Sequence, residues 1–364
     1  MAMSRADAPA FITGVGVVSP LGVGIEQFAR GFFERDPLRQ GDGGIPSLRQ
    51  VPDFEISCLV DIDDFNLSTD SKYALGAATL ALEHRALKCS PVEPSLFGLV
   101  TATSCCNGNP NDELPHGSQL ISDHLSINGY RHSLSGDCLC GARAMQQGWD
   151  AVSSGQCDML LAGGFDVPSR TAKDSLSQGL SAVLGEGAAF LSMESEAALD
   201  EAAANPICRL ASAVCVDIEG NSCSSRKSSR QKIRSHLCQA VELALEKAGL
   251  WEGDIGAVFL CSGRDTSEVA REAEACLLDE VSRVPLSSVK ECVGETFAAS
   301  FPLECAAATL VLNRGCLPGG VSLQEVTNGI EIWVEQEPQR LLGKAVLVIG
   351  CSDTTAAAAL LTRE

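Results

Sequence analysis

The sequence alternates short apolar segments with segments of helical spacing, and this alternation runs through the chain twice. Before Pro206, apolar segments typical of strands lie at 10–22, 96–104, 157–166 and 187–194, with helical patterns at 68–87 and 140–156. After Pro206, apolar segments lie at 207–216, 255–263 and 345–361, with helical patterns at 234–250 and 267–281. Strands that alternate with helices predict a mostly parallel sheet buried between helices. The sequence therefore predicts an α/β fold made of two similar halves, residues 1–204 and 205–364.

Local signals mark some of the segment ends. Ser68, Thr69 and Asp70 can cap the helix over 68–87, and Gly249 can end the helix over 234–250. Two segments lack a periodic pattern. Residues 30–54 contain Gly and Pro and predict a loop, and residues 217–232 are polar and Ser-rich.

The composition suits a large apolar core and an acidic surface. Hydrophobic residues make up 45% of the 364-residue chain, and the formal net charge is −20. This excess of negative charge argues against nucleic acid or an anionic membrane as the main partner. No apolar stretch reaches ~18 uninterrupted residues, and the first residues lack the apolar region of a secretory leader. We therefore expect a soluble, cytoplasmic protein without membrane insertion.

The 17 cysteines follow neither a disulfide pattern nor a zinc pattern. Their number is odd, and the close pairs Cys105–Cys106 and Cys138–Cys140 lack the spacing of a structural zinc site. We expect most of them to be reduced thiols that pack as small apolar side chains. We expect no metal and no cofactor.

Several segments, taken in their order, resemble the β-ketoacyl-acyl-carrier-protein synthases, which are condensing enzymes of the thiolase superfamily. The segments are "ITGVGVVSPLG" from Ile12, "DHLSINGYRHSLSGDCLCGARA" from Asp123, "GQCDMLLAGGFD", "LGEGAAFLSME" and "PLSSVKECVGETFAASFPLECAAATLVLNRGCLPG" from Pro285. The resemblance covers nearly the whole chain. It implies a thiolase-like fold in which two pseudo-duplicated α/β halves form five layers, αβαβα.

The resemblance puts Cys138 at the family's reactive cysteine and Lys290 at its lysine. A thiol at the first turn of a helix meets exposed N–H groups and the positive end of the helix dipole, which favour the thiolate. The same N–H groups can hold the oxyanion that forms when a thioester is attacked. Cys138 is therefore the candidate nucleophile. Cys140 is either a substrate contact or a buried small residue, and Lys290 either holds the charges around the site or satisfies nearby carbonyls.

The chain departs from the family pattern where the chemistry lies. Ser262 and Glu295 stand where the resemblance puts the two histidines that polarise the thioester and stabilise an enolate. Near the C-terminus, Cys351 and Ser352 replace residues of a Phe/Gly-rich loop that supplies an oxyanion N–H, and we expect both to line the substrate site. The segment 166–185 is also shorter than in typical members.

These replacements argue against decarboxylative condensation. An ionised Glu295 would repel the negative charge that develops on an enolate, and Ser262 can donate one hydrogen bond but cannot become a cation. Loss of one well-placed donor costs ~3–4 kcal/mol of barrier, and here two are replaced. Four other histidines lie in segments predicted to be surface helix or loop, and we expect them to be solvated: His84, His116, His132 and His236.

Three functions are compatible with this pattern. The first is a chain-length-factor-like subunit of a type II fatty-acid or polyketide-type pathway, which does not condense but pairs with an active ketosynthase; the retained Cys138 fits it less well. The second is an acyltransferase in which Cys138 passes an acyl group from a carrier-protein thioester to an acceptor. Glu295 would then be the general base, with its pKa raised by burial. The third is a paralogue that keeps only structural residues.

The expected partners follow from the same resemblance. They are an acyl carrier protein and, in the assembly, either a second copy of the chain or an active ketosynthase. One basic cluster can dock an acidic carrier through phosphate and carboxylate contacts, unless it is a solvated loop that leads into a helix. Its members are Arg226, Lys227, Arg230, Lys232 and Arg234.

Overall fold

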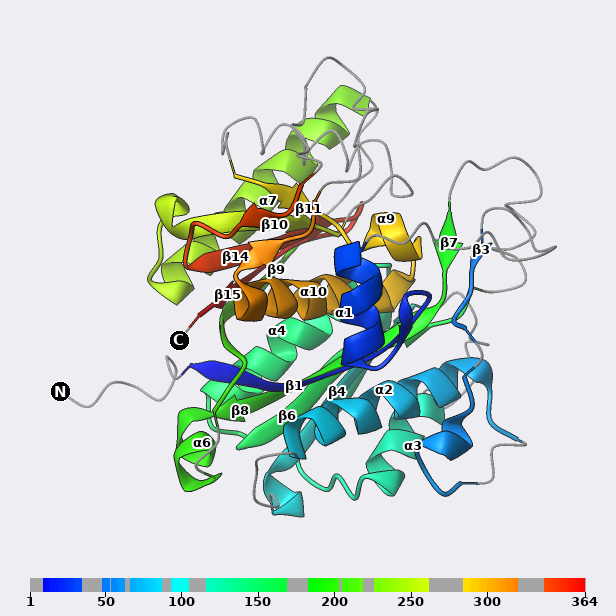
Figure 1. The fold of residues 1–364 in the computed structure, drawn as a ribbon. Coiled ribbons are helices and arrows are strands. Elements are labelled where there is room, and N and C mark those ends of the chain that lie inside the picture. Colours follow the sequence, from blue (N-terminus) through cyan, green and yellow to red (C-terminus); the bar gives the residue numbers. More distant parts are fainter. Residues whose placement is uncertain are drawn as a thin grey trace.

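The described chain is arranged in five layers (Figure 1). The computed structural model describes residues 9–34, 48–52, 54–62, 66–86, 93–104, 116–168, 183–202, 205–218, 226–261, 284–319 and 337–363. Helices α2 (Thr69–Ala86) and α3 (His116–His124) form one outer layer, and α7 (Arg226–Ala248) forms the other. Helices α4 (Cys140–Ser153) and α10 (Ser300–Arg314) lie in the middle and contact strands on both sides. The αβαβα arrangement expected from the sequence is confirmed.

The strands of the described chain form one large sheet and two small ones. The large sheet contains β1 (Ala10–Ser19), β2 (Gly22–Val23), β4 (Phe97–Ser104), β5 (Arg131–Gly136), β6 (Met159–Asp166), β8 (Gly187–Ser195), β9 (Cys208–Asp217), β10 (Ile255–Leu260), β11 (Leu286–Ser287), β14 (Ala345–Cys351) and β15 (Thr355–Thr362). The small sheets pair β3 (Leu48–Arg49) with β7 (Leu184–Gly185) and β12 (Cys316–Leu317) with β13 (Gln339–Arg340). The other helices are α1 (Ile25–Glu34), α6 (Glu196–Ala202) and α9 (Lys290–Val293), with 3-10 turns η2 (Ile56–Cys58), η3 (Pro94–Leu96), η5 (Glu252–Asp254) and η6 (Phe297–Ala299).

The order of the strands repeats in the two halves of the large sheet. The order is β11-β10-β14-β15-β9-β1-β8-β6-β4-β5, so β5-β4-β6-β8-β1 corresponds to β11-β10-β14-β15-β9. In each half the first two pairings are parallel and the next two are antiparallel, and β1 joins β9 in antiparallel register. The repeated topology supports the pseudo-duplication, and the boundary at residue 205 stays a prediction.

The sheet is mixed, so the prediction of a mostly parallel sheet is wrong. A connection of only three residues, 352–354, joins β14 to β15, and a turn that short can only reverse the chain direction. Strand β8 likewise runs antiparallel to both of its neighbours, β6 and β1.

Three apolar clusters fill the spaces between the layers. One lies between α2 and the first half of the sheet, and another lies between α7 and the second half. The largest contains residues of α4, α10 and strands of both halves. Glycines permit the close approach of these layers: a Cβ on Gly141 of α4 or on Gly164 of β6 would collide with the carbonyl oxygen of Ala298 in η6.

Local expectations and structure differ at several element ends. Residues 30–34 belong to α1, which buries Phe28 and Phe32, so the predicted loop over 30–54 starts too early. Helix α7 begins at Arg226, eight residues before the predicted start, so the basic cluster lies on a helix and not in a loop. The helix predicted over 267–281 lies outside the described residues.

Candidate functional site

Cys138 lies in the short turn between β5 and α4. Strand β5 ends at Gly136, α4 begins at Cys140, and the N–H of Cys140 donates to the carbonyl of Asp137 at 3.1 Å. Cys138 itself is half-buried, whereas the two residues that follow it are buried in the central core. The thiol therefore lies directly before the start of a core helix, as the sequence predicted.

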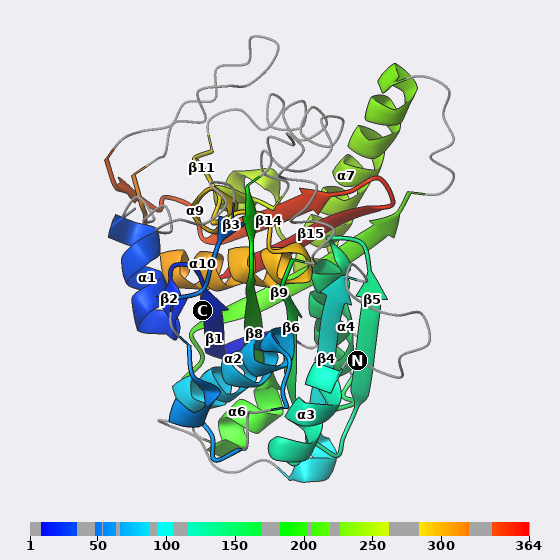
Figure 2. The same cartoon turned by 90° about the vertical axis from the view of Figure 1, so that its right-hand side faces the viewer.

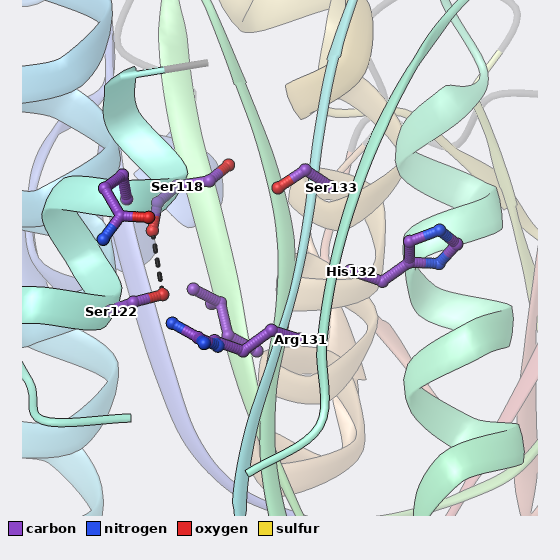
Figure 3. Close-up of a pocket in the computed structure, with 7 residues that line it drawn as sticks. Ser118, Ser122, Arg131, His132 and Ser133 are labelled. Carbon is purple, nitrogen blue, oxygen red and sulfur yellow. Dashed lines mark hydrogen bonds between the residues drawn. The ribbon is translucent and has the colours of Figure 1, made fainter. Parts of the chain in front are cut away.

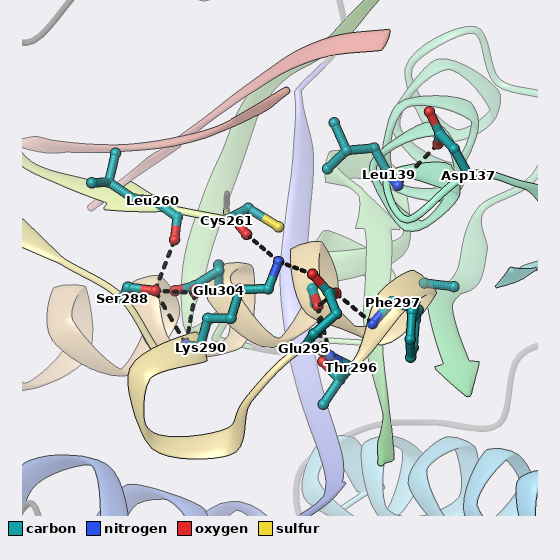
Figure 4. Close-up of polar contacts among 12 residues, drawn as sticks. Asp137, Leu139, Leu260, Cys261, Ser288, Lys290, Glu295, Thr296, Phe297 and Glu304 are labelled. Carbon is teal, nitrogen blue, oxygen red and sulfur yellow. Dashed lines mark hydrogen bonds and ion pairs between the residues drawn. The ribbon is translucent and has the colours of Figure 1, made fainter. Parts of the chain in front are cut away.

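Lys290 and Glu295 form a buried ion pair near this thiol (Figure 4). Lys290 is the first residue of α9, and its Nζ also donates to the carbonyl oxygen of Cys261 at 2.8 Å. The other carboxylate oxygen of Glu295 accepts from the N–H of Phe297 at 2.8 Å and from the hydroxyl of Ser300 at 3.0 Å. Both charged side chains are only 5% exposed. Glu295 therefore has three donors around its carboxyl group.

The charges of this pair act on each other and on the thiol. Burial lowers the pKa of Lys290, but the adjacent Glu295 carboxylate outweighs it, so the pKa of Lys290 is raised overall and the ammonium stays charged. Burial raises the pKa of the Cys138 thiol to about 12. The charge of Glu295 adds to this rise, Lys290 opposes it, and Asp137 adds a smaller contribution. In this geometry the thiol is protonated at neutral pH, so the expectation that the helix start favours a thiolate is not met.

Two buried carboxylates hold the segment 288–298 that carries the ion pair. Glu304 of α10 accepts the N–H of Val289 at 3.0 and 2.9 Å, and Asp166 at the end of β6 accepts the N–H of Ala298 at 2.8 Å. Burial raises the pKa of each carboxyl to about 7, against the opposing effect of these hydrogen bonds. The sequence analysis assigned no role to either residue, because an isolated Glu in an apolar helix gives no sign of its partners.

A hydrogen-bond cluster joins the Cys138 turn to the turn between β14 and β15. The hydroxyls of Ser352 and Thr354 both donate to Oδ2 of Asp137 at 2.5 Å, and the N–H of Leu139 donates to Oδ1 at 2.9 Å. Ser352 therefore lies beside the Cys138 turn, and its predicted place in the lining of a substrate site stays a prediction. Neither Asp137 nor Thr354 was singled out by the sequence.

The other predicted site residues lie elsewhere or outside the described chain. Cys351 is fully buried in the cluster between the sheet and α7, because side chains alternate along β14 and Gly350 is the residue that faces Leu139 and Cys261. Cys140 is buried in the central core. Ser262 lies outside the described residues, as do the side chains of Arg226, Lys227 and Arg230. Lys232 and Arg234 are half-buried on α7.

A separate surface pocket lies between α3 and the edge of the sheet (Figure 3). Its volume is about 340 Å³, and its lining consists of Leu99, Ser118, Gln119, Ser122, Arg131, His132 and Ser133. Ser118 and Ser133 point toward each other across it, whereas His132 points to the opposite side of β5. None of the predicted site residues lines this pocket. Within the described ranges, no group of His, Cys, Asp and Glu side chains could hold a metal ion, and no helix has the length and apolarity to cross a bilayer.

Comparison with known proteins gives the same family that the motifs suggested. A Streptomyces halstedii protein named as a polyketide β-ketoacyl synthase 2 is 26% identical over 382 residues, which is 89% of this chain and 90% of that protein. The 3-oxoacyl-[acyl-carrier-protein] synthase 2 of Rhizobium meliloti is 23% identical over 86% of this chain and 88% of its own length. Over most of its length the chain is therefore similar in sequence to β-ketoacyl synthases of polyketide and fatty-acid synthesis. No family model matches the sequence.

Solved structures of this family have the same fold. The ishigamide ketosynthase/chain length factor superposes with a TM-score of 0.83 at 19% identity, over 99% of this chain and all of that chain. A second match comes from the structure of a type II PKS acyl-carrier protein in complex with its ketosynthase bound to the hexaketide. The matched chain superposes with a TM-score of 0.78 at 16% identity, over 98% of this chain and all of that chain. At these identities the likeness establishes the fold alone.

Proposed function

We propose that the chain is a non-decarboxylating, chain-length-factor-like partner of an active ketosynthase in a type II fatty-acid or polyketide-type pathway. The observation that carries the proposal is the buried ion pair between Lys290 and Glu295. The family resemblance implies that Glu295 stands where a condensing enzyme has a histidine that can donate to an enolate. Here the carboxylate of Glu295 accepts from three donors, among them Lys290, and it has no hydrogen of its own to donate to a substrate.

The electrostatics of the pair argue against loss of carbon dioxide from a malonyl unit. An enolate near Glu295 would meet a fixed negative charge at close range in a site of low dielectric. The charge of Lys290 is neutralised by Glu295 and directed at the carbonyl of Cys261, so it is not available as a substitute. A protonated Cys138 is also a poor nucleophile toward a thioester. Each of these features favours a subunit that does not condense.

The edge of the large sheet supports the pairing part of the proposal. Strand β5 is the last strand of the described sheet, beside β4, and Figure 2 shows it at the outer edge. The N–H of Leu99 donates to the carbonyl of Tyr130, which fixes the register with β4 and turns the N–H and C=O of Arg131 and Ser133 outward. Natural proteins cover or block such an open edge. The edge strand of a second ketosynthase-type subunit fits it.

Co-purification with a complete ketosynthase tests this proposal. A tagged chain is co-expressed with a ketosynthase that has both histidines and is captured by its tag. We expect a 1:1 complex, and we expect Ser133→Pro, which removes an outward N–H without touching the β4 ladder, to weaken it. Asp123→Asn, an exposed change on α3, is the matched control. The proposal fails if the chain purified alone forms a β-ketoacyl product from a malonyl thioester.

Cys138-dependent acyl transfer is the second candidate, and one observation favours it. Cys138 is half-buried, so a reagent can reach it, and it lies directly before a core helix. The test is incubation with an acyl-carrier thioester followed by peptide mass spectrometry. An acyl adduct on Cys138 that is absent in Cys138→Ser would favour the transferase over the partner subunit. The absence of an adduct, together with a 1:1 ketosynthase complex, would favour the partner subunit.

A further inference from the structure

The carboxylate of Asp137 connects two turns that are far apart in the sequence. One is the Cys138 turn, residues 137–139, and the other is the C-terminal turn, residues 352–354 between β14 and β15. Oδ1 accepts from Leu139 within the Cys138 turn at 2.9 Å, and Oδ2 accepts the hydroxyls of Ser352 and Thr354 at 2.5 Å each. Asp137 and Ser352 are 215 residues apart.

The C-terminal turn is itself well braced. The hydroxyl oxygen of Ser352 accepts the N–H of Thr354 at 3.2 Å and of Thr355 at 3.0 Å, and the N–H of Ser352 donates to the carbonyl of Thr355 at 2.8 Å. The hydroxyl that binds Asp137 is therefore held in place from its own side. A carboxylate between two fixed hydroxyls and an N–H has little rotational freedom, because hydrogen bonds to an ionised acceptor are the stronger kind.

We propose that Asp137 is a positioning residue that clamps the Cys138 turn to the C-terminal turn and thereby fixes where the thiol lies. The clamp also puts the carboxylate of Asp137 one residue from the thiol, where its charge adds to that of Glu295 in raising the pKa of Cys138. Position and charge are thus set by one side chain. The inference goes beyond the proposed function, since it holds whether the chain pairs with a ketosynthase or accepts an acyl group.

Substitutions at the clamp separate its two effects. In Asp137→Asn the amide oxygen still accepts from Leu139 and the amide nitrogen can donate to the Thr354 hydroxyl, but the Ser352 hydroxyl, which already accepts two N–H groups, loses its acceptor, so the clamp is weakened and the charge is lost. In Asp137→Ala both are lost. Thr354→Val keeps the charge and the Ser352 bond, and it replaces the Thr354 hydroxyl with a methyl group of similar size. Asp123→Asn on α3 is the control for loss of a distant surface charge.

Two measurements on the full chain follow these effects without any acyl substrate or partner. The first is the rate of Cys138 alkylation by iodoacetamide between pH 7 and pH 9, quantified on the peptide that carries Cys138. We expect Asp137→Asn to raise the rate at pH 8 by about twofold, less than Glu295→Gln does, since the charge of Asp137 is the smaller of the two that suppress the thiolate. The second is hydrogen–deuterium exchange of the peptides over 137–142 and 350–356. We expect exchange to rise most in Asp137→Ala and in both peptides together, and to rise to a smaller extent in Thr354→Val and in Asp137→Asn, each of which loses one hydroxyl bond.

The clamp is overturned if Asp137→Ala or Thr354→Val loosens only one of the two turns, or neither. The electrostatic part is overturned if Asp137→Asn alkylates no faster than wild type and Asp123→Asn. Thr354→Val keeps the inference testable if Asp137→Ala does not fold. Failure of the proposed function would be seen in co-purification and product assays, which these measurements do not involve.

Discussion

The ion pair between Lys290 and Glu295 makes a prediction about stability that can be worked from its contacts. In Lys290→Met the carboxylate stays buried and keeps two of its three donors, the N–H of Phe297 and the hydroxyl of Ser300. In Glu295→Gln the ammonium stays buried and keeps the carbonyl of Cys261. Breaking a buried pair by removing one partner typically costs 3–5 kcal/mol. Because each remaining charge keeps some hydrogen bonds, we expect each single variant to lose about 3 kcal/mol.

The double variant is the informative member of the series. Lys290→Met combined with Glu295→Gln leaves no charge buried, so its loss should be well below the ~6 kcal/mol sum of the single variants, with a coupling of about 3 kcal/mol. The free energy of unfolding is measured by urea titration, followed by tryptophan fluorescence. Lys344→Met breaks the exposed pair with Asp254 and should cost far less, because solvent screens that pair.

Additive losses in the double variant would refute this reasoning. They would mean that Lys290 and Glu295 do not neutralise each other. Single losses no larger than that of Lys344→Met would have the same meaning. In either case Glu295 would be available for other roles, including that of a base, and the argument against catalysis would lose its main support.

Three further predictions follow. Glu295→Gln removes the negative charge that raises the pKa of Cys138, so alkylation of Cys138 at pH 8 should be at least several-fold faster than in wild type; an unchanged rate would contradict the assigned contact. The carboxyl of Glu304 has a pKa raised to about 7, so it favours the folded state below pH ~4.5 and this contribution is lost as pH rises toward 7; urea titrations at pH 5 and 8 should give a smaller fall in Glu304→Gln than in wild type. His84 behaves in the opposite sense: burial lowers its pKa and its Nδ1 accepts the N–H of Val15 at 3.1 Å, so stability falls as pH drops through ~6.5 and below, and His84→Asn, which keeps an acceptor, should remove that part of the pH dependence.

The local sequence pattern was enough to predict most of the helices and strands. The strands β1, β4, β6, β8, β9, β10 and β14 and the helices α2 and α4 follow from apolar period and length, since each buries an apolar face. Strand β5 was missed because "RHSLSG" has an exposed edge position and little apolar pattern. Helix α7 was predicted to start too late because its first turns are polar and Ser-rich, a composition typical of loops. His84 was expected to be solvated, but the α2–β1 contact makes it an acceptor for the backbone.

The site could be predicted as a set of residue types, but not as a set of interactions. The resemblance located Cys138, Lys290 and Glu295, and nothing in a linear sequence reveals that the last two neutralise each other. The expected thiolate failed for a quantitative reason: a helix terminus is worth ~0.3–1 kcal/mol at an exposed position, whereas burial of a charged group costs several times more. The clamp by Asp137 depends on a contact 215 residues away, which only the closed fold supplies.

The two inner helices have a consequence for any attempt to divide the molecule. Helices α4 and α10 are packed by residues from both sides of the duplication, and α10 is apolar almost all around, with Ser300 through Leu312 buried. Cutting the chain between the repeats would expose a large apolar surface to solvent on each fragment, and neither fragment could bury that surface by itself. The duplication is thus visible in the strand order, but the two repeats share one core and are not independently stable. We expect the molecule to unfold in a single cooperative transition.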